Sequence, residues 1–84
     1  MSERRQILRG TLAEKKERRN KLMMDFQDLI TAINNFPAFA TTRKIEELDT
    51  KALINTAENL DAVVTEYKEV SAVIKKIKDE LGLG

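Results

Sequence analysis

The chain has 84 residues and contains neither cysteine nor histidine. A chain of this length forms one small domain of modest stability, and the missing residue types exclude disulfides and the usual ligands of zinc, haem and iron–sulfur clusters. They also remove the commonest general base and the thiol nucleophile, and the three glycines form no phosphate-binding loop. We therefore expect no enzyme, no cofactor, no metal and no small-molecule substrate.

Charge is distributed unevenly along the chain, although the formal net charge is only +1. Up to Lys21 there are eight basic and three acidic residues, a net charge of +5, and the remainder has seven basic and eleven acidic residues, a net charge of −4. The halves can therefore pair with each other, or the basic half can mark an anionic partner. The N-terminus does not resemble a signal peptide and no apolar run is long enough to span a membrane, so we expect a cytoplasmic protein.

The first half of the chain predicts a long helix with one inner side. Residues at alternating spacings of four and three lie on one side of a helix. Nine residues follow this spacing: Leu8, Leu12, Lys15, Arg19, Leu22, Phe26, Leu29, Ile33 and Phe36. We expect the helix to span about 3–35, because Pro37 has no amide proton and disfavours helical geometry in the residue before it.

The start of this helix has two interpretations. Gly10 costs about 1 kcal/mol inside a helix, and Thr11 and Glu14 have the spacing of a capping box, so a basic arm could precede a helix that begins at Thr11. We favour a continuous helix from near Ser2, because Leu8 keeps phase with Leu12 across the glycine.

The second half predicts a more uniformly apolar helix over about 50–81. Asp49 or Thr50 supplies an N-cap, and Gly82 can take the left-handed conformation of a Schellman-type stop. We expect the connector to span 36–49, with a helical turn at 43–48. The alternative is a second helix that begins at Thr42 without interruption, and we favour the break because it makes the two helices nearly equal in length. Nine residues form an inner stripe free of charge: Leu53, Thr56, Leu60, Val63, Tyr67, Val70, Ile74, Ile77 and Leu81.

Together the two segments predict an all-α, antiparallel two-helix hairpin of the coiled-coil type, in which the numbers of facing residues sum to about 86. The polar stretch 13–21 then faces the valines of the second helix. Either the stems of Lys15 and Arg19 cover these valines, or a second chain does. Because the second helix is apolar over a wide face, we expect a homodimer that forms a four-helix bundle.

The leading interpretation is a non-enzymatic interaction or adaptor module that self-associates and binds a protein partner through its helix faces. A small accessory protein of a bacterium, phage or plasmid is the setting that we expect. The residues of the expected partner or self-association face are Val63, Val64, Tyr67, Val70, Val73, Ile54, Phe36 and Phe39.

The alternative interpretation is a regulator that binds nucleic acid through the basic first helix, because several Lys and Arg side chains together neutralise phosphates. The residues of this face are Arg4, Arg5, Arg9, Lys15, Lys16, Arg18 and Arg19. The architecture is similar in outline to the plasmid copy-number regulator Rop, a dimeric helical hairpin that binds RNA, and no residue-level match carries that function over. The segment has no aromatic residue to stack on bases, and we favour a solvated helix face as the explanation of its charges.

Overall fold

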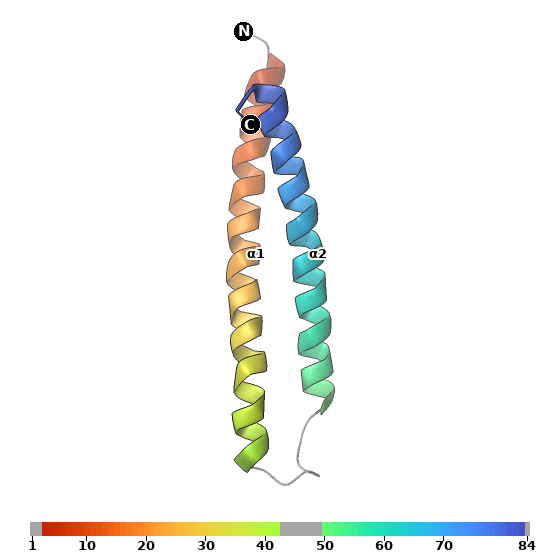
Figure 1. Cartoon of the computed structure of the whole chain (residues 1–84). Coiled ribbons are helices and arrows are strands. Elements are labelled where there is room, and N and C mark those ends of the chain that lie inside the picture. Colours follow the sequence, from red (N-terminus) through yellow and green to blue (C-terminus); the bar gives the residue numbers. More distant parts are fainter. Residues whose placement is uncertain (1–2, 43–49, 84) are drawn as a thin grey trace.

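The chain folds into a helical hairpin, here in a computed structural model that describes residues 3–42 and 50–83, with side chains described for 3–36 and 50–83. Helix α1 spans Glu3–Thr42 and helix α2 spans Thr50–Leu81. They run antiparallel, so that the two termini lie at the same end of the rod (Figure 1). The molecule measures 66 × 17 × 15 Å. The predicted all-α hairpin is therefore confirmed.

The helices form because their inner stripes meet. All nine predicted inner residues of α2 are buried or half-buried, and so are the inner residues of α1 except Phe26, which is 39% exposed. Thr56, the one threonine in these stripes, donates its hydroxyl to the Ala52 carbonyl at 2.9 Å, which satisfies the group locally. The spacing of four and three thus predicts the contact surface of each helix.

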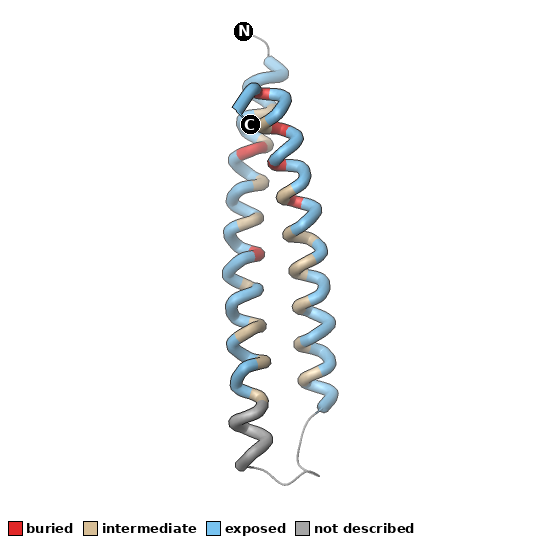
Figure 2. Tube along the Cα trace, in the orientation of Figure 1, coloured by how far each residue is buried: buried red, intermediate tan, exposed pale blue. Residues whose placement is uncertain are grey.

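The core lies mainly toward the termini (Figure 2). The buried cluster consists of Leu12, Leu22, Val70, Ile74, Ile77 and Leu81, with Leu8, Val63 and Tyr67 packed against it. Between Met23 and Phe36, and between Thr50 and Glu69, no described residue is buried. We call residues 3–22 and 69–83 the terminal half, and residues 23–36 and 50–68 the connector half. The helices seal against each other in the first and leave apolar surface uncovered in the second.

The two ends of the hairpin near the termini are well defined. Of the two starts considered for the first helix, the structure has the continuous one, because α1 passes through Gly10 without a break. At the other end Gly82 has a φ of +74°. Its N–H donates to the Asp79 carbonyl at 3.2 Å, and the Leu83 N–H donates to the Lys78 carbonyl at 2.8 Å. These two bonds are the predicted Schellman motif.

The predicted end of the first helix near Asn35 is wrong, since α1 continues through Pro37 to Thr42. A proline inside a helix leaves the carbonyl four residues earlier, that of Ile33, without its N–H partner. It does not prevent the residues after it from being helical, and alanines at positions 38 and 40 favour helix. The expected turn at 43–48 and the Asp49 cap lie outside the described residues.

Candidate functional site

One face of the hairpin is closed by ion pairs, and we call it the ion-pair face. Arg18 of α1 binds Glu66 of α2 through two hydrogen bonds: its Nε donates to Oε2, and its Nη2 donates to Oε1 at 2.8 Å. Near the termini, Nη2 of Arg4 lies 3.3 Å from Oε2 of Glu80. Both pairs join residues whose numbers sum to 84, which agrees with the register predicted from the stripes.

The Arg18–Glu66 pair shifts both groups toward their charged forms. The hydrogen bond from Arg18 is the main cause that lowers the pKa of the Glu66 carboxyl, and the positive charges of Arg18 and Lys15 add to it. The same hydrogen bond raises the pKa of Arg18. Because both side chains are about 40% exposed, this pair fixes register more than it adds stability.

This pair predicts a pH dependence. A carboxyl with a lowered pKa stabilises the fold at pH values above its unfolded pKa of about 4.3, and this contribution disappears as the pH falls through the lower folded value. Wild type should therefore be more stable than Glu66→Gln at neutral pH, and the two should converge in acid below about pH 4. Urea unfolding of both chains across this pH range measures the difference. A difference that stays constant with pH would contradict the assignment.

The opposite face contains an open apolar groove of about 540 Å³ in the middle of the rod. Its lining is almost entirely apolar, although two polar side chains border it. The lining residues are Met23, Phe26 and Gln27 from α1 and Val63, Val64, Tyr67 and Lys68 from α2. Met23 is 43% exposed and Phe26 39% exposed, which is unusual for large apolar side chains next to a core. We call this side of the hairpin the groove face.

The groove face changes character along the rod. The inner residues of each stripe occupy the a and d positions of a heptad, with Leu12 and Leu53 at a positions. The two ion pairs then join g positions of both helices, whereas Met23 and Val64 in the groove occupy e positions. The e positions of the connector half are Met23, Ile30, Ala57 and Val64. The e positions of the terminal half are Arg9, Lys16, Ser71 and Lys78. One face is therefore apolar at one end and basic at the other.

The structure divides the predicted partner face. Val63, Val64 and Tyr67 line the groove, and Ile54, at 55% exposed, lies on the same side of α2 by its heptad position. Val70 is buried in the hairpin's own core, so it is not available to a partner. Val73 is 39% exposed but occupies a g position, on the ion-pair face. Phe36 is half-buried at an inner position, and the side chain of Phe39 lies outside the described ones.

The predicted anion-binding face is also divided. Arg4 and Arg18 bind glutamates on the ion-pair face, and Nη2 of Arg5 donates to the Leu81 carbonyl at 3.2 Å. Lys15 and Arg19 are half-buried at inner positions, as expected if their stems cover the core. Only Arg9 and Lys16 of the seven lie on the groove face.

Sequence reasoning missed several groove residues. Met23, Phe26, Gln27 and Lys68 line the groove, but none was assigned to a partner surface. The positions beside each stripe, combined with the pairing of facing residues between the two helices, could have identified them. Met23 and its neighbour Met24 look equivalent in sequence, yet only the former lies at an e position.

The fold and the groove define a two-helix hairpin with ion pairs on one face and an open apolar groove on the other. No described helix has a stretch that is apolar enough to cross a membrane. Comparisons with protein-family models, with curated proteins and with solved structures find no match to this chain. The function must therefore be inferred from the surface itself.

Proposed function

We propose that this chain is a non-enzymatic helical interaction module that self-associates, and that a second copy covers the apolar part of its groove face. The observation that supports this proposal is the groove at Met23, Phe26 and Val64, where a monomer leaves large apolar side chains in water. A second copy fits because its surface carries the same apolar groove, and a twofold axis brings identical patches together.

The charge pattern favours one arrangement of the two copies. Full-length antiparallel overlap would place the basic terminal half of each chain on the apolar connector half of the other. A parallel arrangement would bring Arg9 and Lys16 close to their own copies, which is unfavourable. An antiparallel arrangement in which only the connector halves overlap matches apolar with apolar and separates the basic ends. This is a bundle of four helices over part of the rod only.

The size of the overlap sets the expected affinity. The segment from Met23 to Phe36 is about 20 Å long and two adjacent helices are about 20 Å wide, so each chain buries about 400 Å². The total of about 800 Å² is below the range of about 1,200–2,000 Å² that stable complexes bury. We therefore expect a reversible dimer with a dissociation constant in the micromolar range.

Substitutions in the groove should weaken this dimer. Val64→Lys puts a charge into the interface twice, once from each chain, and a loss of about 1.5 kcal/mol per copy corresponds to at least about a 100-fold weaker dissociation constant. Met23→Gln should weaken it less. Sedimentation or light scattering at tens of micromolar and above measures the mass.

The chain offers matched controls for both variants. Met24 is 65% exposed and Val73 39% exposed, and both lie away from the groove face, so Met24→Gln and Val73→Lys should leave the dimer intact. A monomeric mass for wild type at tens of micromolar would exclude self-association. Equal effects of groove and control variants would exclude the groove as its site.

A distance measured between the two copies distinguishes the half-overlapped dimer from a full-length overlap. Gln27 and Asn20 occupy equivalent b positions one heptad apart on the groove face. In the half-overlapped dimer Gln27 lies closer to the twofold axis, whereas in a full-length overlap Asn20 lies closer. Spin labels attached through Gln27→Cys should therefore give a shorter distance between copies than labels attached through Asn20→Cys. The reverse order would support full-length overlap.

A further inference from the structure

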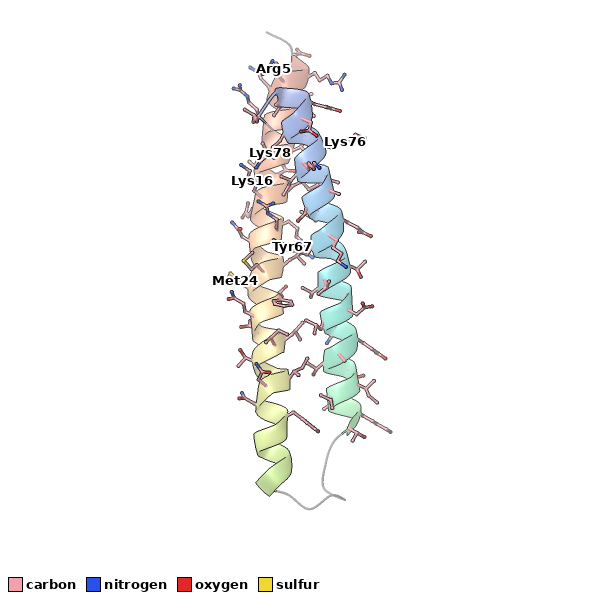
Figure 3. The ribbon with its side chains drawn as sticks, viewed as in Figure 1. Arg5, Lys16, Met24, Tyr67, Lys76 and Lys78 are labelled. Atoms are coloured by element: carbon pink, nitrogen blue, oxygen red, sulfur yellow. The ribbon has the colours of Figure 1, made fainter. Side chains whose placement is uncertain are left out.

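The basic end of the groove face is a second surface, distinct from the apolar groove. It brings together residues from both helices: Arg9, Lys16, Lys75 and Lys78. Arg9, Lys16 and Lys75 are exposed and Lys78 is half-buried. Figure 3 shows Lys16 and Lys78 at similar heights in the terminal half, with Lys76 on the outer side of α2. We call these four residues the basic cluster.

The four residues of the basic cluster have almost no acidic neighbours on their own helices. On a helix, a residue contacts those three and four positions away. At these positions Arg9, Lys16 and Lys78 have no acidic residue, and Lys75 has only Asp79. None of the four forms an ion pair with another residue in the described part of the chain. This contrasts with the ion-pair face, where Arg4 and Arg18 of α1 bind glutamates of α2.

From this arrangement we propose that the basic cluster binds the phosphate backbone of double-stranded nucleic acid, without reading its sequence. Four positive side chains on one side of a straight rod suit a regular, linear polyanion, and the separation of Arg9 and Lys16 is about 10 Å along α1. This surface lies outside the groove, so the inference goes beyond the dimerisation proposed above.

The residues between the four charges favour a duplex over the other anionic partners. Ala13 and Ser71 lie between them, and Gln6 and Asn20 lie beyond the two ends of the cluster on α1. No large apolar side chain therefore lies among the four charges to insert into a lipid surface or to anchor a peptide. No aromatic residue lies in the cluster to stack on unpaired bases, which is how single strands are commonly held. Phosphate contacts to a duplex need neither feature.

The test is the binding of the full chain to a short fluorescent DNA duplex of mixed sequence, measured by anisotropy at increasing salt. Four phosphate contacts predict a log–log slope of about −3.6, and therefore about a 100-fold loss of affinity between 50 and 200 mM salt. Changing the four residues of the cluster to glutamine together should reduce the affinity at low salt at least tenfold and bring the slope toward zero.

A control variant with the same change in net charge separates position from total charge. Arg4→Gln, Lys21→Gln, Lys51→Gln and Lys76→Gln together also remove four positive charges, but from other faces of the rod. This variant should retain most of the affinity and the salt slope. Helical content measured by circular dichroism shows that both variants fold, and single glutamine variants of Arg9 and Lys16 replace the quadruple variant if it does not.

Three results would overturn the proposal. The first is no binding of wild type to the duplex at low salt. The second is an equal loss of affinity in the cluster and control variants, which would mean attraction by net charge alone. The third is stronger binding to anionic vesicles than to the duplex, which would assign the surface to a membrane.

Discussion

Replacement of Leu22 by alanine is expected to lower the free energy of unfolding by about 2–5 kcal/mol. Leu22 is 1% exposed and belongs to the buried cluster, where it is the residue nearest to the connector half. Truncation removes its packing and leaves a cavity that two rigid helices cannot close. Because native domains are stable by only about 5–15 kcal/mol, and small ones by less, this single change should unfold a large part of the population.

Urea denaturation followed by the helical circular dichroism signal measures this loss. Ile7→Ala is the matched control, because Ile7 is an equally large aliphatic residue of α1 that is 66% exposed, so its truncation should change stability by less than about 0.5 kcal/mol. If the two variants unfold at the same urea concentration, Leu22 does not hold the helices together and the described core is incorrect.

The inner stripes and their register could be predicted from sequence because a two-helix hairpin has few alternatives. The spacing in α2 identifies its contact side, and the matching stripe of α1 then fixes which residues meet. Arg5 donating to Leu81 and Arg18 binding Glu66 have number sums of 86 and 84, close to the predicted 86. Here periodicity alone carries three-dimensional information.

The inner stripes alone do not predict which neighbours surround the e and g residues beside them. Val64 and Val73 both widen the apolar face of α2 in sequence, but they occupy e and g positions on opposite sides of the seam. Only the register of α1 shows that Val64 lies beside Met23, in the groove, whereas Val73 shares its flank with Glu66. In the same way, the basic N-terminal segment suggests one charged surface, and the structure distributes it over two faces and an interior.

The predicted end of α1 is wrong because proline disfavours a helix without always ending it. Proline disfavours a helix interior by about 3 kcal/mol relative to alanine, which a long helix can tolerate when the residues that follow the proline favour helix. Removal of the proline should therefore stabilise the fold. Pro37→Ala should raise the free energy of unfolding by about 2 kcal/mol, since part of the gain is offset by the greater freedom of the unfolded chain.

The sign of this change in stability distinguishes a helix that ends at Asn35 from one that continues to Thr42. If the helix ended at Asn35, Pro37 would lie in the connector, where its rigidity stabilises the fold, and alanine would leave stability unchanged or lower it slightly. Within α1 the substitution instead supplies an amide that can donate to the Ile33 carbonyl. That new amide should be protected in hydrogen exchange. Pro37→Gly should gain about 1 kcal/mol less than Pro37→Ala; equal stabilities for the two variants would place position 37 outside a helix.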